Sequence, residues 1–240
     1  MNLIIDTGNT RTKLAIFKND VLQSLLKVKT KKVLKQLNTL FEEFKISNCI
    51  ISSVTNIDDG VLDYLEKNIN FLIILNSETQ IPFKNLYTTP KTLGVDRIAL
   101  MAASQKKYPN TNVLVIDAGT CITYDLLNSR NEYFGGAIAP GINMKYKAMH
   151  HFTANLPLLK PKAVLKAGNS TKNTMHQGVI NGTLLEIEGV ISQYKKNNDN
   201  LTVVLTGGDT IFLAKLLKSS IFANPNFLLE GLNHILNYNL

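Results

Sequence analysis

The stretch Leu3-Ile4-Ile5-Asp6-Thr7-Gly8-Asn9-Thr10 joins a short apolar run to a polar turn. A second apolar run follows at Lys13-Leu14-Ala15-Ile16-Phe17, and a third extends over residues 21–28 after the turn residues Asn19-Asp20. Strand-length apolar runs separated by Asp, Gly and Asn are typical of β-hairpins. The first 28 residues therefore predict a three-stranded antiparallel meander.

The residues after this meander alternate between helical and strand patterns. Apolar residues recur at the helical period over residues 31–44, and residues 61–69 predict a second helix. Residues 49–51 and 71–75 are short apolar runs of strand length. This alternation predicts a β-α-β-α-β order with a parallel component in the sheet.

The opening pattern occurs a second time, half a chain later. Val115-Ile116-Asp117-Ala118-Gly119 aligns with Ile4-Ile5-Asp6-Thr7-Gly8, and strands are expected at residues 121–127 and around Tyr133 and Phe134. An internal repeat of this length indicates a duplicated structural unit. We therefore expect an α/β protein with two similar domains, residues 1–108 and 109–240, that face each other across a cleft.

The rest of the second half continues with helices and one more strand. The patterns predict a helical stretch over residues 171–195, a strand at 201–205, and helices at 209–217 and 232–238. The first of these carries Gly178, Gly182 and Gly189 among apolar residues, so we expect it to pack against the core, a partner chain or both. Large apolar patches usually meet partners, which predicts a homodimer.

The two equivalent turns suggest a phosphate-binding function. Gly8 lets the backbone approach an anion, successive N–H groups can point at phosphate, and Lys13 can reach the same anion. For the first turn alone, an ordinary hairpin turn explains the residues equally well. The second copy at Asp117-Ala118-Gly119-Thr120 favours the functional interpretation, because one nucleotide would be held from both sides. Two such turns in one cleft are expected of a phosphotransferase.

Two further segments combine polar residues with a helix start. Asp96 and Arg97 precede an apolar helix, where they are either a cap with a salt bridge or a proton acceptor beside an anion-binding group. Thr206-Gly207-Gly208-Asp209 is either a plain strand-to-helix turn capped by Asp209, which we favour, or a place for a base or ribose.

Five motifs, in this order, resemble type III pantothenate kinases over nearly the whole chain. They are Asp6-Thr7-Gly8-Asn9-Thr10, Gly94-Val95-Asp96-Arg97, Asp117-Ala118-Gly119-Thr120, Gly135-Gly136-Ala137-Ile138-Ala139-Pro140-Gly141 and Thr206-Gly207-Gly208-Asp209. The turn motifs are shared with the wider superfamily of acetate and sugar kinases, Hsp70 and actin, whereas the second and fourth motifs are specific to this family. The resemblance implies duplicated ribonuclease H-like (actin-like ATPase) domains, each with a mixed sheet, an antiparallel meander and flanking helices.

The resemblance also implies an activity and a site. The reaction is transfer of the ATP γ-phosphate to the primary hydroxyl of pantothenate, which gives 4'-phosphopantothenate in the first step of coenzyme A synthesis. Asp96 is implied as the proton acceptor and Asp117 as the ligand of a monovalent cation, K⁺ or NH₄⁺. The implied ATP-binding residues are Asp6, which also holds Mg²⁺ through the phosphates, and Thr7, Gly8, Asn9, Thr10, Arg11, Thr12, Lys13 and Thr120. The implied pantothenate-binding residues are Tyr87, Gly94, Val95, Asp96, Arg97 and Thr171, with the partner chain of a homodimer completing the pocket.

Composition limits the other classes of protein. The chain has 240 residues, of which 45% are hydrophobic and 18% charged, so it can build a packed core. The longest apolar runs are only strand-sized, and Leu3-Ile4-Ile5 meets Asp6 at once, so we expect neither a membrane span nor a secretory signal and place the protein in the cytoplasm. The two cysteines lie far apart in apolar runs, which argues against a disulfide or a zinc site.

The net charge of +8 raises the question of a nucleic-acid partner. The lysines are spread along the chain rather than clustered, so we interpret them as solvated faces and expect no nucleic acid to bind. The chain contains neither a Walker A loop nor a Gly-x-Gly-x-x-Gly fingerprint, which excludes P-loop NTPases and Rossmann dinucleotide domains.

Two alternative functions stay open at this point. One is a kinase of the same superfamily that acts on another small hydroxy acid or sugar. The other is a non-catalytic nucleotide-binding regulator, which the intact pair of Asp96 and Arg97 disfavours.

Overall fold

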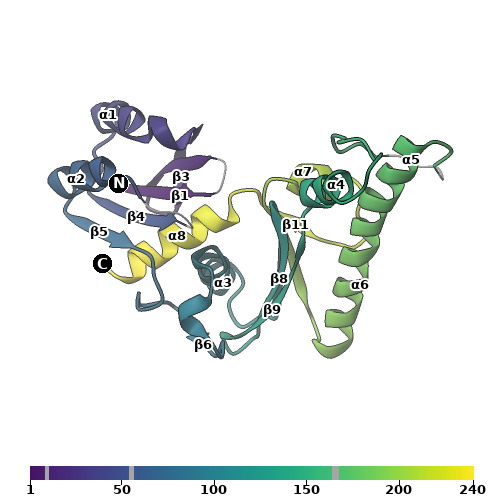
Figure 1. Ribbon diagram of the computed structural model, residues 1–240. Coiled ribbons are helices and arrows are strands. Elements are labelled where there is room, and N and C mark those ends of the chain that lie inside the picture. Colours follow the sequence, from purple (N-terminus) through teal and green to yellow (C-terminus); the bar gives the residue numbers. More distant parts are fainter. Residues whose placement is uncertain (9–10, 54–56, 164–167) are drawn as a thin grey trace. The chain divides into compact units, whose positions relative to one another are not determined.

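The computed structural model describes residues 1–8, 11–53, 57–163 and 168–240, which form two compact units (Figure 1). The first unit consists of Met1–Pro109, Asn131–Tyr133 and Phe227–Leu240, and the second of Asn110–Arg130 and Phe134–Asn226. The division into domains at residues 108 and 109 stays a prediction. The structure adds that two later segments of the chain belong with the first unit.

The sheet of the first unit has the order β3-β2-β1-β4-β5. β1 (Asn2–Thr7), β2 (Thr12–Lys18) and β3 (Val21–Val28) form an antiparallel meander. β4 (Asn48–Ser53) lies parallel to β1, and β5 (Phe71–Ile74) lies parallel to β4. The predicted meander and the parallel component are both confirmed.

Two helices, α1 (Val33–Glu43) and α2 (Asp59–Asn68), pack on one face of this sheet. Alternate residues of the strands, such as Leu3 and Ile5, share a buried cluster with Leu37 of α1. The side chains that recur at every second residue of the strands therefore pack against those that recur at the helical period, in one core. The remaining elements of this unit before the last helix are two 3₁₀ turns (Thr30–Lys32 and Pro90–Thr92), β6 (Lys84–Asn85) and α3 (Val95–Lys107).

The last helix, α8 (Phe227–Tyr238), packs on α3 of the first unit. The sequence pattern predicts this helix at residues 232–238 and within the second half of the chain. It begins five residues earlier, and most of its side chains are buried. The helical period identifies the helix, but not the element against which its apolar face packs.

The second unit contains β7 (Val113–Ala118), β8 (Cys121–Leu127), β10 (Thr202–Thr206) and β11 (Phe222–Ala223). β7 and β8 form an antiparallel hairpin, β10 lies parallel to β7, and β11 parallel to β10. β9 (Glu132–Pro140) lies next to β8 and starts at residues that belong to the first unit. It includes Gly135 to Pro140, so this strand is longer than the sequence pattern indicated.

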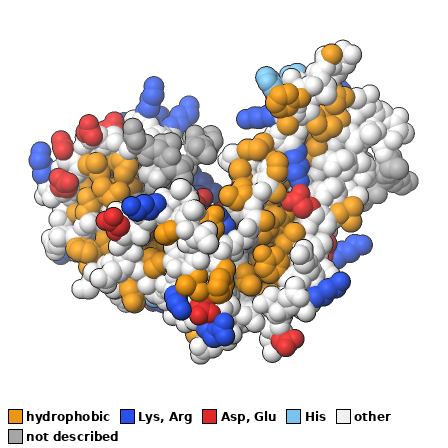
Figure 2. All heavy atoms as spheres, turned by 60° about the horizontal axis from the view of Figure 1, so that its bottom comes forward, with side chains coloured by type: hydrophobic (Ala, Val, Ile, Leu, Met, Phe, Trp, Pro, Cys, Tyr) orange, Lys and Arg blue, Asp and Glu red, His pale blue; other side chains and the backbone are white. Residues whose placement is uncertain are grey.

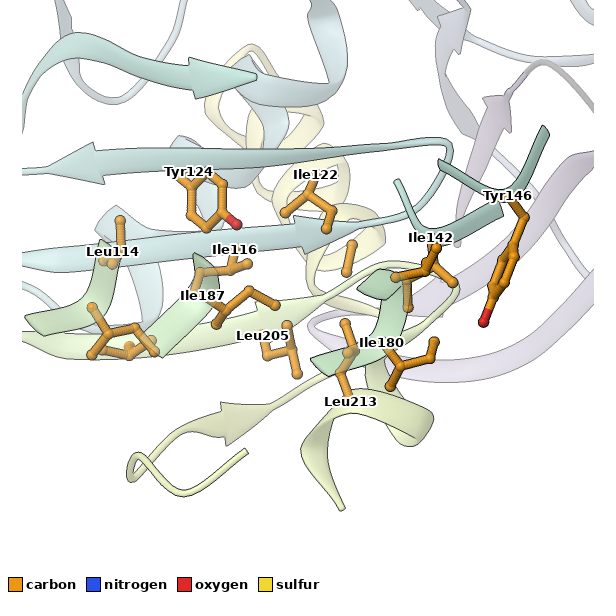
Figure 3. Close-up of a cluster of buried hydrophobic side chains, with 14 residues drawn as sticks. Leu114, Ile116, Ile122, Tyr124, Ile142, Tyr146, Ile180, Ile187, Leu205 and Leu213 are labelled. Atoms are coloured by element: carbon orange, nitrogen blue, oxygen red, sulfur yellow. The ribbon is translucent and has the colours of Figure 1, made fainter. Parts of the chain in front are cut away.

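The helices of the second unit are α4 (Ile142–His151), α5 (Thr171–His176), a π-helical turn (Gln177–Asn181), α6 (Gly182–Asn197) and α7 (Thr210–Ala214). Figure 3 shows the buried cluster in which side chains of the sheet, such as Ile116 and Leu205, meet Ile187 of α6. α7 ends at Ala214, earlier than predicted. Within the described parts of the chain, no helix is long and apolar enough to cross a membrane.

Candidate active site

The first predicted phosphate turn connects β1 to β2. The N–H of Gly8 donates to the carbonyl of Arg11 at 3.1 Å, which closes the turn, while Asn9 and Thr10 lie outside the described residues. Where the two strands meet the turn, the hydroxyl oxygens of the paired residues Thr7 and Thr12 lie 3.4 Å apart. The turn is thus a tight connection between two strands, as the sequence predicts.

Asp6 and Lys13 face each other as register partners on β1 and β2. Nζ of Lys13 lies 3.2 Å from Oδ2 of Asp6, and the side chains are 30% and 13% exposed. An ammonium group and a carboxylate that lie side by side next to this turn can together bind a phosphate group and the metal ion that accompanies it. The ammonium attracts phosphate oxygens, and the carboxylate suits a hard divalent cation.

Gly94 and Asp96 form the start of α3. Gly94 is the N-cap residue, and Oδ1 of Asp96 accepts a hydrogen bond of 2.8 Å from the N–H of Arg97. A Cβ atom at position 94 would collide with this same Oδ1, so only glycine leaves room for the carboxylate in this orientation. The helix N-terminus stabilises negative charge in its first turn. The arrangement holds the carboxylate at a fixed place, as a proton acceptor requires.

Arg97 is buried among aromatic rings, with only 6% of its surface exposed. Its guanidinium carbon lies 5.5 Å from the ring centre of Tyr87 and 5.9 Å from that of Tyr133. The structure therefore brings together Tyr87 and Arg97, two residues predicted for the pantothenate site. Tyr133 is a member of this group that sequence reasoning missed, because it was interpreted only as part of a strand.

The second predicted turn connects β7 to β8. The N–H of Gly119 donates to the carbonyl of Cys121 at 2.9 Å, and Thr120 is exposed at the tip. Gly207 follows β10 with a φ of +95°, and a Cβ atom at this position would collide with Oδ1 of Asp117. Glycine is needed here both for the left-handed backbone and for the close approach to Asp117.

Asp117 stands in a row of oxygen-bearing side chains across three neighbouring strands. Its register partners are Thr123 on β8 and Thr206 on β10. Directly paired residues point to the same face of a sheet. Oγ1 of Thr123 is buried and has no hydrogen-bond partner among the described residues. Carboxylate and hydroxyl oxygens are suitable donors for a hard cation, so this row fits the monovalent ion that was predicted at Asp117.

Asp209 occupies the N-cap position of α7 but makes no capping hydrogen bond with its side chain. Its N–H donates to the carbonyl of Ala118 at 2.9 Å, and burial raises the pKa of its carboxyl group. The segment after β10 is therefore tied to the second turn through its backbone. The strand-to-helix turn with Asp209 at the N-cap is therefore as predicted, although the side chain of Asp209 does not itself cap the helix.

Two predicted pantothenate-binding residues remain: Val95 is the first residue of α3, and Thr171 lies at the start of α5 in the second unit. Thr171 is exposed and lines a cavity of 460 Å³ together with Asn169 and Ser170. The roles of Thr171 and of the other predicted site residues stay predictions. Among the described residues, no cluster of three or more His, Cys, Asp and Glu side chains could hold a metal on its own.

Solved structures with a similar fold are known. The chain matches a Campylobacter jejuni protein named as a Baf family transcriptional activator with a TM-score of 0.65 and 24% identity, over 99% of this chain and 98% of that one. It also matches a ROK family glucokinase from Streptomyces griseus with a TM-score of 0.52 and 10% identity, over 99% and 98% of the two chains. These likenesses concern the fold, and they support the ribonuclease H-like (actin-like) fold class that the resemblance implied.

Curated relatives are closer in sequence. A type III pantothenate kinase from Christiangramia forsetii is 48% identical over 100% of this chain and 99% of the relative. One from Flavobacterium johnsoniae is 41% identical over the same shares. The family model described as type III pantothenate kinase matches residues 2–193. The chain belongs to the type III pantothenate kinase family.

Proposed function

We propose that this chain transfers the γ-phosphate of ATP to pantothenate, the first step of coenzyme A synthesis, with Asp96 as the proton acceptor. Family membership over the whole chain supports the activity. The observation that carries the assignment to residues is the start of α3. There a carboxylate fixed by Gly94 adjoins a buried arginine that contacts Tyr87.

The first turn would hold the phosphates of ATP. Lys13 contributes a positive charge, and the backbone N–H groups around Gly8 suit phosphate oxygens. Mg²⁺ would be held by Asp6 together with the phosphates, because magnesium usually keeps one or two carboxylates plus substrate oxygens. When bound, this ion neutralises charge on the phosphate groups. Thr120, exposed at the tip of the second turn, is the proposed ATP contact of the second unit.

Asp96 would accept the proton of the primary hydroxyl of pantothenate. As that oxygen forms its bond to the γ-phosphorus, the bond from phosphorus to the bridging oxygen of ADP breaks, and ADP leaves. Such transfers need precise positioning and charge stabilisation rather than covalent help from the protein. Arg97 would bind the carboxylate of pantothenate, since a guanidinium forms forked hydrogen bonds with that group.

Asp117 would hold a monovalent cation, K⁺ or NH₄⁺. Its row with Thr123 and Thr206 supplies oxygen donors of the right kind. The ion would add positive charge beside the second turn.

A homodimer is the proposed assembly. Gly182, Leu185 and Gly189 recur at helical spacing along one side of α6, and Leu185 is 66% exposed. Apart from its chain neighbours and the backbone of its own helix, no described atom lies within 4 Å of a Cβ atom built on either glycine. Glycines inside a helix cost stability, and nothing in the described part of this chain requires them there. A second copy that packs closely on this side explains them. Figure 2 shows further hydrophobic side chains gathered on the surface of the second unit.

A coupled assay of ATP consumption tests the proposal. The wild type should turn over with pantothenate and not with acetate or hexoses, and Asp96→Asn should bind both substrates but lose roughly 10²- to 10⁴-fold in turnover. The control is Asp59→Asn, which changes an exposed carboxylate in the first turn of α2, whereas Asp96 is half-buried in the first turn of α3. Activity with a hexose instead of pantothenate would indicate another kinase, and tight ATP binding without turnover would indicate a regulator.

A further inference from the structure

Tyr133 is a fully buried aromatic residue for which the reaction described above has no use. It comes from the first residues of β9, far in sequence from the helix start that carries Asp96 and Arg97. Both segments nevertheless belong to the same compact unit. The question is whether this ring only fills space or acts on its neighbour Arg97.

Arg97 and the two aromatic rings beside it have a regular arrangement. The ring centres of Tyr87 and Tyr133 are 6.2 Å apart, with the planes inclined by only 18°. The guanidinium carbon lies 5.5 Å from the first centre and 5.9 Å from the second. The cation therefore adjoins both rings, at distances within the range of cation–π contacts.

The position of Tyr133 is fixed from two sides. Its carbonyl accepts a hydrogen bond of 2.8 Å from the N–H of Leu86, which also places Tyr87 beside it. Phe83 packs edge-on against the ring of Tyr133, with the centres 6.1 Å apart and the planes at 85°. The backbone of Tyr133 is thus tied to the strand of its neighbour, and its buried ring is packed between Phe83 and the contact with Arg97.

The chemistry of this contact suits a carboxylate site. Arg97 is buried, and cation–π attraction is strongest where water is excluded. Contact with a ring face does not itself occupy the N–H donors of the guanidinium, which bind carboxylates edge-on. An arginine that is already oriented loses less freedom when its ligand arrives.

We propose that Tyr133 is a positioning residue that holds Arg97 in the orientation needed to bind the carboxylate of pantothenate. This inference rests on the proposed role of Arg97. Tyr133 itself does not touch the substrate. Its contribution is therefore specific to ligands that carry a carboxylate.

The test compares Michaelis constants of Tyr133→Leu and Tyr133→Phe. Tyr133→Leu removes the ring and should raise the KM for pantothenate roughly 5- to 30-fold, with the KM for ATP unchanged. Tyr133→Phe keeps the ring and should restore nearly the wild-type value. Pantetheine has an amide in place of the carboxylate, so its kinetics should change less.

A double mutant distinguishes action through Arg97 from a general packing effect. In the Arg97→Ala background, Tyr133→Leu should raise the KM for pantothenate by less than twofold, because the group that it positions is already absent. Phe227→Leu is the matched control, since it removes another fully buried ring of the same unit. It should lower the melting temperature without changing either Michaelis constant.

If Tyr133→Leu does not fold, pentafluorophenylalanine at position 133 keeps the shape of the ring and reverses its quadrupole. The KM for pantothenate should then rise relative to Tyr133→Phe. The proposal is overturned if the effects of Tyr133→Leu and Arg97→Ala multiply independently, if the KM for ATP rises equally, or if the fluorinated ring behaves like phenylalanine. If Arg97→Ala alone leaves the KM for pantothenate unchanged, the proposed role of Arg97 fails instead.

Discussion

Nδ2 of Asn2, on the first strand, donates a hydrogen bond of 2.8 Å to Oδ1 of Asn233, 231 residues later on the last helix. Asn233 in turn donates to the carbonyl of Asn19 and to Oδ1 of Asp20, each at 3.2 Å. The amide of Asn233 thus connects β1, the turn after β2 and α8. Asn2 and Asn233 are both buried, so their side-chain amides rely on these hydrogen bonds in place of bonds to water.

Asn233→Ala should lower the free energy of unfolding by about 1–3 kcal/mol, because Nδ2 of Asn2 loses an acceptor in a buried place. Urea denaturation followed by circular dichroism measures this change. Asn68→Ala removes an amide that donates to Tyr64 on an exposed helix surface, and it should cost about 0.5 kcal/mol or less. Equal losses in the two variants would show that the amide network does not hold α8 in place.

This network illustrates why sequence reasoning succeeded in some places and failed in others. The meander follows from a local pattern, and its register then places Asp6 opposite Lys13, because residues on both sides of a short turn face each other. The partner of α8 depends on contacts between distant segments, and an apolar helix face does not specify what covers it. The helix therefore could be predicted, but not its attachment to the first unit.

The same distinction applies to the candidate site. Gly94, Asp96 and Arg97 are neighbours in sequence, and their motif could be identified directly. Tyr133 reaches Arg97 only because the two-residue strand β6 pairs with Glu132 and Tyr133. So short a strand leaves no periodic signal, and an aromatic residue in a predicted strand is usually part of the core.

Lys13→Met should raise the KM for ATP by roughly 10- to 100-fold, the amount expected when a charge-assisted hydrogen bond is lost. The KM for pantothenate should change little. Lys18→Met is the control, because Lys18 is exposed on the same strand and lies outside the turn. Initial rates over a series of ATP concentrations give both constants. If Lys18→Met has the same effect, the role of Lys13 is only that of general surface charge.

His234 should make stability depend on pH. Burial lowers its pKa, the charge of Lys106 lowers it further, and Asp20 acts in the opposite direction. On acidification, the unfolded chain takes up a proton near the ordinary pKa of about 6.5, before the folded chain does. The stability present above that pH is therefore lost as the pH falls toward the lowered pKa of the folded state. When the pH is lowered from about 7.5 to about 5.5, His234→Gln should lose less unfolding free energy than the wild type. His151→Gln changes an exposed histidine and should lose as much as the wild type.

Leu185→Glu should convert a dimer into a monomer, because it would bury a charge in the proposed interface along α6. Sedimentation velocity at micromolar concentration measures the change. Ile211→Glu alters an equally exposed apolar residue on α7, 65% against 66%, and should leave the dimer intact. A wild-type protein that sediments as a monomer would contradict the proposed assembly, and dissociation by both variants would place the interface elsewhere.

Asp117→Asn should abolish the response to K⁺. In the wild type, replacing Na⁺ by K⁺ should raise both the turnover and the melting temperature, because an ion that binds only the folded chain stabilises it. The variant keeps the shape of the side chain but lacks the charge that attracts a cation to the row with Thr123 and Thr206. It should therefore show the same melting temperature in both salts and a large loss of activity. Asp199→Asn, at an exposed position after α6, should respond to K⁺ as the wild type does. Since melting temperature needs no substrate, it separates loss of the ion from loss of catalysis. A wild type whose melting temperature and turnover are equal in the two salts would exclude a cation site at Asp117.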